Sequence, residues 1–465
     1  MNGIRKRRIK RKNLLLPYFL LSFVSASVIV CGILLGLFAI LTGGKNDFQL
    51  QKAAELAPAM SDSAQNVLAS PTPEERGVWI ATVSNINFPS KRGLPATELK
   101  AELNDIVETV ASVGGNAIYF QVRPSSDAFY KSEIFPTSSW LTEKQGDPLP
   151  SGLDPLAYLI EIAHAKNIAV HAWINPLRAA GSADAEYLKS NIAKNNPARL
   201  YPEYTVAYAD NRLYYNCGLP EVRQLVADGV REIVKNYDVD GIVFDDYFYP
   251  YPVSGGVFDD SEAYAMYGRE YDNLGDFRRA SVNALVKLCH DTVKEEDPDC
   301  RFGISPFGIW QNDDGSNGGS DTAGLSSYSA IYCDPLAWLA EGSVDYIAPQ
   351  LYWSFGTSVA RYDVLVKWWN DAIAPYPDVD LYIAHGVYRC EEWGDSAEIA
   401  SQIDFARNEK TFRGSMLYGY AAIKDNVFGL RETLLSAFED EIYHTTVISD
   451  GDAVKITLEK DENGN

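Results

Sequence analysis

Two adjacent aspartates, Asp245 and Asp246, are the residues of this sequence best placed to do chemistry. They follow the short apolar run Gly241 to Phe244, whose β-branched residues are typical of a buried parallel strand. Side chains alternate between the faces of a strand, so Asp245 points inward if Ile242 and Phe244 face outward, and Asp246 sits on the rim where the strand opens into a loop. Carboxylates are rarely buried without a partner or a task. The structural alternative is that one aspartate pairs with an arginine and the other caps the next loop.

Paired carboxyl groups carry out glycoside hydrolysis, and enzymes that retain the anomeric configuration hold them about 5–5.5 Å apart. Side chains of sequence neighbours diverge from one strand end, which favours a different use of this pair. If the substrate carries a 2-acetamido group, its own carbonyl oxygen can act as the nucleophile. Asp245 would then orient the acetamido N–H, and Asp246, with a raised pKa, would protonate the leaving oxygen and later activate water. Asp127, on the loop after an earlier predicted strand, is the reserve carboxylate.

Polar and aromatic side chains recur at the ends of the other predicted strands. Aromatic faces stack on sugar rings, and Asn, Gln, Arg and His hydrogen-bond hydroxyl and amide groups, so the mixture predicts a carbohydrate groove. A single tyrosine or tryptophan in such a place is more often packing, and the clustering at one rim is what supports the prediction. The predicted substrate-binding residues are Gln121, Arg123, His171, Trp173, Asn175, Tyr247, Gln311, Asn312, Gln350, Tyr352, Trp353, His385 and Tyr418.

Other chemistries fit the sequence less well. His171 and His385 lack a close set of His or Asp partners at metal-ligand spacing, so we predict neither a metal site nor a cofactor. Ser305 is followed by a proline and lacks the G-x-S-x-G turn of a serine nucleophile, which argues against a Ser–His–Asp triad. No G-x-G-x-x-G phosphate turn follows any predicted strand.

Strand-like and helical segments alternate eight times along the chain. Such alternation implies right-handed crossovers and a parallel sheet, and eight units imply a closed (β/α)₈ TIM barrel with its chemistry at the C-terminal ends of the strands. A doubly wound open sheet is the alternative, but it usually has fewer units and opens with a Gly-rich turn. The predicted strands are 77–84, 117–122, 168–174, 241–244, 301–310, 344–352, 380–387 and 414–421, and the predicted helices are 97–113, 155–166, 221–236, 275–296, 335–341, 359–373, 397–408 and 427–441.

The segments that flank the barrel carry their own signals. Residues 1–12 are rich in Lys and Arg, and the uncharged stretch 14–44 that follows is long enough to span a bilayer core of about 30 Å. This order predicts one transmembrane helix with the N-terminus in the cytoplasm and the barrel outside. A cleaved signal peptide is the alternative, although its apolar core is usually only about 7–15 residues. The predicted domains are the basic segment and anchor (1–44), a stalk (45–75), the barrel (76–444), and a β-hairpin around Asp450-Gly451 with a disordered tail (445–465).

The chain is acidic, with 63 Asp and Glu against 41 Lys and Arg and a formal net charge of −22. This balance argues against nucleic acid as a partner and against an anionic polymer that covers the whole outer face. Beyond the apolar stretch, the cysteines are odd in number and fit no zinc spacing, so no disulfide framework is predicted, although Cys289 and Cys300 could pair.

Several motifs between about residues 75 and 440 resemble one family. They are R-G-V-W-I-A-T-V, Q-V-R-P-S-S-D-A-F-Y, H-A-W-I-N-P-L-R, D-G-I-V-F-D-D-Y-F-Y-P, I-S-P-F-G-I-W-Q-N and D-Y-I-A-P-Q-L-Y-W, and together they are similar to the glycosyl-hydrolase-like family ten. The resemblance implies a TIM barrel and an extracellular glycoside hydrolase that acts on cell-wall peptidoglycan strands stripped of their stem peptides. The F-D-D run also resembles the paired aspartates of N-acetylglucosaminidases that work by substrate assistance. The chitinase pattern D-x-x-D-x-D-x-E is absent, because Val243 and Tyr247 stand where acids would be.

The leading hypothesis is therefore a membrane-anchored glycoside hydrolase of N-acetylated wall glycan. A barrel that binds such a glycan without cutting it is the second hypothesis. A hydrolase of another, neutral polysaccharide is the third.

Overall fold

The computed structural model describes residues 74–439, and these form a closed barrel of eight parallel strands. The strands follow one another around the barrel in sequence order, and β11 closes it by pairing with β1 from Glu75↔Gly414 to Val78↔Leu417. This is the order that right-handed crossovers produce, and it confirms the predicted TIM barrel. The barrel strands are β1 (Glu75–Ile80), β2 (Ala117–Arg123), β3 (Ala169–Ile174), β7 (Gly241–Phe244), β8 (Arg301–Ile304), β9 (Tyr346–Ile347), β10 (Asp380–Gly386) and β11 (Phe412–Tyr418).

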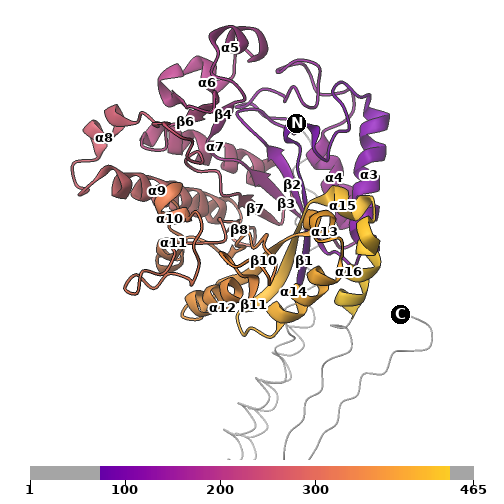
Figure 1. Ribbon diagram of the computed structural model, residues 1–465. Coiled ribbons are helices and arrows are strands. Elements are labelled where there is room, and N and C mark those ends of the chain that lie inside the picture. Colours follow the sequence, from indigo (N-terminus) through magenta and orange to yellow (C-terminus); the bar gives the residue numbers. More distant parts are fainter. Residues whose placement is uncertain (1–73, 440–465) are drawn as a thin grey trace, which may run out of the picture. The chain divides into compact units, whose positions relative to one another are not determined.

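Amphipathic helices surround the barrel (Figure 1). Local signals start several of them: Pro155 opens one, where Asp154 caps the chain by accepting from the backbone N–H of Ala157, and Asn273 caps another through the N–H of Asp276. Their apolar stripes pack on the outer faces of the strands and on one another. The helices that follow the barrel strands are α3 (Ala96–Ser112), α4 (Pro155–His164), α7 (Pro220–Asn236), α9 (Leu274–Glu296), α11 (Pro335–Glu341), α12 (Tyr362–Ile373), α14 (Ala397–Arg407) and α16 (Leu430–Glu439).

Strand alternation around β7 is as the sequence predicts. Ile242 and Phe244 belong to the core between strands and helices, while Val243 packs inside the barrel among aromatic side chains such as Trp79 and Trp173. The next inward position after Val243 is Asp245, at the C-terminal end of the strand. The fold thus carries this carboxyl group to the mouth of the barrel.

Several predicted strands run past their observed ends, such as 77–84, which ends at Ile80, and the excess is largest in two others. The segment 301–310 is a strand only as far as Ile304, and the segment 344–352 only at Tyr346–Ile347. Pro306 and Pro349 lie directly beyond these ends, and a proline has no N–H to donate to a sheet. The chain therefore leaves the barrel earlier than its apolar pattern indicates, and only isolated bridges such as Phe307↔Gln350 continue the pairing.

A small antiparallel sheet stands between β3 and α7, where no strand was predicted. Its strands are β4 (Arg178–Ala180), β5 (Thr205–Ala207) and β6 (Leu213–Tyr215), and α5 (Ala185–Asn191) and α6 (Pro197–Leu200) lie between them in the chain. Figure 1 shows these elements together at one end of the barrel. They belong to the connection that follows β3, so they border the C-terminal ends of the strands.

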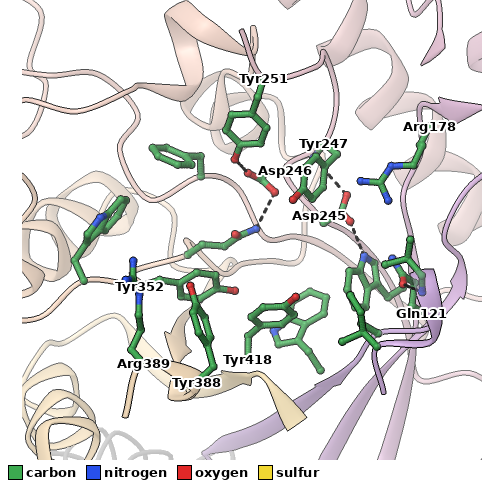
Figure 2. A pocket seen from close by; sticks show the side chains of 18 residues that line it. Gln121, Arg178, Asp245, Asp246, Tyr247, Tyr251, Tyr352, Tyr388, Arg389 and Tyr418 are labelled. Carbon is green, nitrogen blue, oxygen red and sulfur yellow. Dashed lines mark hydrogen bonds between the residues drawn. The ribbon is translucent and has the colours of Figure 1, made fainter. Parts of the chain in front are cut away.

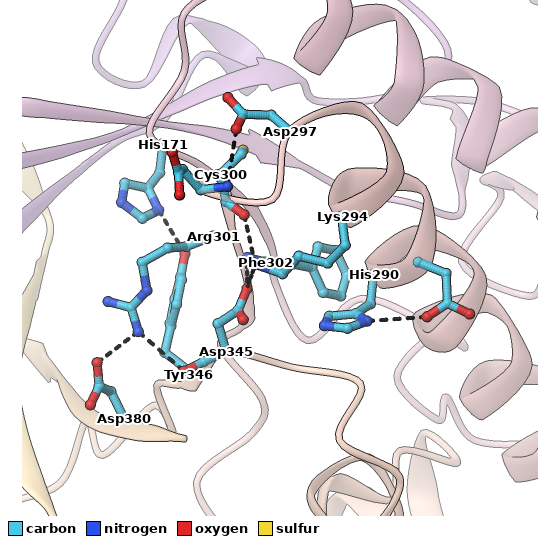
Figure 3. Close-up of polar contacts among 12 residues, drawn as sticks. His171, His290, Lys294, Asp297, Cys300, Arg301, Phe302, Asp345, Tyr346 and Asp380 are labelled. Carbon is cyan, nitrogen blue, oxygen red and sulfur yellow. Dashed lines mark hydrogen bonds and ion pairs between the residues drawn. The ribbon is translucent and has the colours of Figure 1, made fainter. Parts of the chain in front are cut away.

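Buried and half-buried polar groups lie at the opposite, N-terminal end of the barrel interior (Figure 3). Arg301 forms an ion pair with Asp380 at 2.7 Å, and Nδ1 of His171 lies 2.9 Å from the Tyr346 hydroxyl. Burial lowers the pKa of His171 to about 3, so its ring is neutral. In a TIM barrel this end serves stability, which leaves the C-terminal end for a ligand.

The predicted anchor, stalk and C-terminal hairpin lie outside residues 74–439. Among the helices of that range, none combines the length and the apolar character needed to cross a bilayer. The five cysteines in the range are free thiols, and Cys289 and Cys300 do not pair.

Candidate active site

A cavity of about 390 Å³ opens at the C-terminal end of the barrel, and both aspartates line it (Figure 2). Asp245 and Asp246 are 3% and 2% exposed, so each carboxyl group meets solvent only through this opening. No basic side chain of residues 74–439 lies within ion-pair distance of either carboxyl group. The pairing of one aspartate with an arginine, which would have made the pair structural, is thus not found in the described chain.

Asp245 is held by donors from β3 and from its own loop. Its Oδ2 accepts from Nε1 of Trp173 at 2.8 Å and from Nδ2 of Asn175 at 3.4 Å, and its Oδ1 accepts from the backbone N–H of Tyr247 at 3.4 Å. Burial and then the negative charge of Asp246 raise the pKa of Asp245 to about 7. Asp245 therefore holds a proton in mildly acidic solution.

Asp246 is held by two neutral donors. The hydroxyl of Tyr251 donates to its Oδ2, and Nε2 of Gln350 donates to its Oδ1 at 3.1 Å. Burial raises the pKa of Asp246, while these two hydrogen bonds act in the opposite direction by stabilising the carboxylate. Gln350 also donates to the backbone carbonyl of Ser305 at 3.1 Å, which fixes the amide in place.

Aromatic rings form the walls of the cavity. Tyr352 and Tyr418 stack at 5.7 Å between ring centroids and 12° between planes, and Tyr388 meets Tyr352 edge-on at 6.0 Å. Trp353 packs edge-on against Phe307 on another side. Such apolar faces beside carboxyl groups suit the two sides of a sugar ring, with C–H groups toward the rings and hydroxyls toward the polar atoms.

Arg178 supplies positive charge near the pair without binding it. Its guanidinium carbon lies 4.8 Å from the centroid of the Tyr247 ring, and its charge lowers the pKa of both Asp245 and Asp246 somewhat. This arginine belongs to β4, so the small sheet takes part in the site.

The structure brings many of the predicted residues together at this cavity. Those that line it, besides Asp245 and Asp246, are Gln121, Trp173, Tyr247, Gln350, Tyr352, Trp353 and Tyr418. Gln121 lines the wall through a fixed side chain, because its Oε1 accepts from the backbone N–H groups of Thr82 and Val83, each at 2.9 Å.

Arg123 and Asp127, both predicted for the site, do not line this cavity. The pairing of β2 with β3 shifts register between Gln121 and Arg123, and such an irregularity re-aims the side chain that follows it. The guanidinium of Arg123 lies 3.9 Å from the ring centroid of Phe135 and is buried against α7. Asp127 lines a neighbouring cavity instead, where its Oδ2 accepts from Nε2 of Gln145 at 3.2 Å.

Both predicted histidines lie elsewhere. His171 is in the polar network at the N-terminal end, because the inward position nearer the mouth on β3 is Trp173. His385 faces outward from β10, where Ala384 takes the inward position, and its Nε2 lies 3.1 Å from the hydroxyl of Ser415. Burial lowers the pKa of His385 to about 4. Neither ring can reach a ligand in the cavity.

The three predicted amides Asn175, Gln311 and Asn312 support other groups. Asn175 is buried behind Asp245 and also accepts from the backbone N–H of Arg178 at 3.0 Å. Asn312 donates to the carbonyl of Gly324 at 2.8 Å, and Gln311 accepts from Asn317 at 3.2 Å. The last two therefore brace the loop that follows β8 and do not line the cavity.

Several residues that line the cavity were not predicted: Trp79, Arg178, Tyr251, Phe307 and Arg389. Alternation along β1 could have found Trp79, which shares the inward face with Ala81. Tyr251 lies in the same aromatic run as the aspartates. Arg178 comes after the barrel strand β3 and Arg389 after the barrel strand β10, so the alternation along a barrel strand does not predict either of them.

Comparisons with known proteins identify the family of this chain. The sequence model of the family described as glycosyl hydrolase-like 10 matches residues 74–397. The glycosyl hydrolase YngK of Bacillus subtilis (strain 168) is 41% identical over 370 residues, which cover 78% of this chain and 71% of that protein. The glycosyl hydrolase DigH of Escherichia coli (strain K12) is 33% identical over 364 residues, which cover 74% and 82%.

Among solved structures, the glycoside hydrolase domain of PgaB (BpsB) from Bordetella bronchiseptica aligns with a TM-score of 0.49 and 12% identity, over 78% of this chain and 99% of that one. The family match and the two sequence relatives identify the chain: it belongs to the glycosyl hydrolase-like 10 family and is a glycoside hydrolase.

Proposed function

We propose that this protein hydrolyses glycans built from 2-acetamido sugars, and that the substrate's own acetamido group is the nucleophile. The observation that carries the proposal is the placement of Asp245 and Asp246, which line one cavity side by side in sequence and are free of ion pairs within residues 74–439. Two carboxyl groups that diverge from one strand end serve one face of a sugar. They suit substrate assistance better than a nucleophile and an acid on opposite faces of the ring.

The proposed reaction has two steps. In the first, Asp245 accepts the acetamido N–H, the acetamido oxygen attacks C1, and Asp246 gives its proton to the leaving oxygen as the glycosidic bond breaks. In the second, Asp246 removes a proton from water, the water oxygen bonds to C1, and the bond from C1 to the acetamido oxygen breaks. Two inversions at C1 retain the anomeric configuration.

The protonation of the two aspartates fits these roles. Below about pH 7, Asp245 holds a proton because of burial and the charge of its neighbour. An acetamido N–H that arrives at Asp245 stabilises its carboxylate form, and the proton then belongs on Asp246, next to the leaving oxygen. When Asp246 has donated that proton, the hydrogen bonds from Tyr251 and Gln350 stabilise the resulting anion.

The proposed substrate is peptide-free peptidoglycan, and the proposed location is the outer face of a cell membrane. The aromatic walls around Tyr352, Tyr418 and Trp353 suit a sugar chain, and the family model and the two relatives are named for glycoside hydrolysis. The uncharged stretch 14–44, preceded by basic residues, supports an anchor that leaves the barrel outside.

The test compares full-length wild type with Asp246→Asn on peptide-free glycan strands, with new reducing ends as the readout. We expect cleavage by the variant to fall by about 10²–10⁴-fold, because general acid–base catalysis is lost, while it still binds the strands. Asp238→Asn, at an exposed aspartate beyond α7, is the matched control and should cleave normally. Cleavage by Asp246→Asn at the wild-type rate would end the proposal.

A further inference from the structure

Two further cavities adjoin the active-site cavity and extend it over the loops that follow β1, β2 and β3. The first, the middle cavity, has a volume of about 490 Å³ and shares the walls Ile86, Arg178 and Tyr247 with the active site. The second, the outer cavity, has a volume of about 320 Å³ and shares Tyr187 and Asn191 with the middle one. The three are therefore contiguous, as a cleft for a polymer would be.

The lining of the middle cavity is mixed. It presents the half-buried ring of Trp140 together with polar side chains such as Ser139, Gln145 and Asn191, and it also includes Asp127, Arg178 and Arg212. Aromatic rings beside hydrogen-bonding side chains are the combination that also lines the active site, and they suit a sugar chain.

The outer cavity, in contrast, is basic. Two acids, Glu143 and Asp147, and five basic side chains line it. The basic side chains are Arg92, Lys144, Lys189, Lys194 and Arg199. This local excess of positive charge stands on a chain whose net charge is −22, so the average composition does not explain it.

Most of this positive charge is not neutralised by neighbouring acids. Within residues 74–439, the one ion pair that these five side chains form joins Lys189 to Glu186 at 3.9 Å, and both of these side chains are about three-quarters exposed. Arg92 lies over the ring of Trp140, at 4.0 Å from its centroid, and Arg199 donates to the backbone carbonyl of Ile192 at 2.7 Å. Their charges remain available to an anion that enters the cavity.

We propose that the middle and outer cavities are subsites for the same glycan that is cut at Asp245 and Asp246, and that the outer cavity recognises carboxylates carried by its sugars. This inference rests on the proposed function and deepens it. In peptidoglycan, the carboxyl group of N-acetylmuramic acid is masked as an amide where a stem peptide is attached, and it is a free anion where the peptide has been removed. A basic subsite therefore favours stripped strands by electrostatic attraction to their free carboxylates.

The test uses two probes: peptide-free strands with free carboxylates, and the same strands with the carboxyl groups converted to methylamides. The triple variant Lys144→Ala, Lys189→Ala, Lys194→Ala of the full-length protein is compared with wild type for both binding and cleavage. We expect the triple variant to bind the carboxylate strands about tenfold more weakly at low salt, since three exposed charge contacts are lost. The methylamide strands should bind equally to both proteins.

Lys235→Ala is the matched control, because Lys235 is an exposed lysine at the far end of α7, outside all three cavities. The proposal is overturned if the triple variant keeps the wild-type preference for carboxylates, or if it loses affinity for both kinds of strand alike. If the wild type binds the strands with this preference but does not cleave them, the proposed function is contradicted, while the assignment of the outer cavity as an anion-binding subsite is still supported.

Discussion

Replacing Asp245 by asparagine should stabilise the folded protein at high pH. Asp245 is 3% exposed and lies next to a second carboxyl group, and these two causes raise its pKa to about 7. An aspartate in the unfolded chain has a pKa of about 3.9. Ionising Asp245 in the folded state is therefore costly, and asparagine, which has nearly the same shape, removes this cost.

The sign and size of the effect follow from proton binding. Between about pH 4 and pH 7 the folded protein holds a proton on Asp245 that the unfolded chain has released, so the free energy of unfolding falls as the pH rises through this interval. The pKa difference is about 3, and each pKa unit corresponds to about 1.4 kcal/mol. By pH 8, the wild type should have lost about 4 kcal/mol of stability through this one group.

Urea unfolding of full-length wild type and Asp245→Asn at pH 5 and pH 8 measures the effect. The variant should gain several kcal/mol relative to wild type at pH 8, and a clearly smaller amount at pH 5, where the wild-type residue is still protonated. Asp238→Asn, at an exposed position, should show no such pH-dependent difference. A stability difference between Asp245→Asn and wild type that is the same at both pH values would refute the reasoning.

Two predictions concern Arg123 and the helix behind it. Arg123→Met should leave KM and kcat on glycan strands within about twofold of wild type. The reason is that the guanidinium of Arg123 lies on the ring of Phe135, away from the cavity. A large rise in KM would show that Arg123 reaches the substrate. Gly229→Ala should destabilise the barrel by about 1–3 kcal/mol, because a Cβ there would lie 2.2 Å from Nη1 of Arg123. Chemical unfolding should show a smaller loss when Gly229→Ala is introduced into Arg123→Met, because only the second close contact of that Cβ, 2.7 Å to Cε2 of Phe135, then remains. An equal loss in both backgrounds would refute the contact with Arg123.

Much of the fold follows from local patterns in the sequence. The run Gly241 to Phe244 alternates as a barrel strand must, and it alone predicts that Asp245 faces inward. The order of strands and helices then places every strand end at one rim, so residues distant in sequence, such as Gln121 and Tyr418, meet at one cavity.

Most of the errors come from features without a periodic signal, and the error at His385 comes from an alternation that was not applied. A register shift in β2 turns Arg123 away from the rim, and Pro306 and Pro349 end their strands early. His385 looked like a rim residue, yet alternation from Ala384 puts it on the outer face of β10. The small sheet that brings Arg178 to the site has strands of three residues, too short for a pattern to predict.

The central claim is that the substrate's acetamido oxygen is the nucleophile, and the nature of the acyl group tests it most directly. Peptide-free glycan strands can be de-N-acetylated and then re-acylated with either acetyl or trifluoroacetyl groups, which are similar in size but differ greatly in the nucleophilicity of the carbonyl oxygen. The wild-type protein should cleave the acetylated strands and cleave the trifluoroacetylated strands more slowly by orders of magnitude, although it binds both. Equal rates of cleavage on the two kinds of strand would contradict the account.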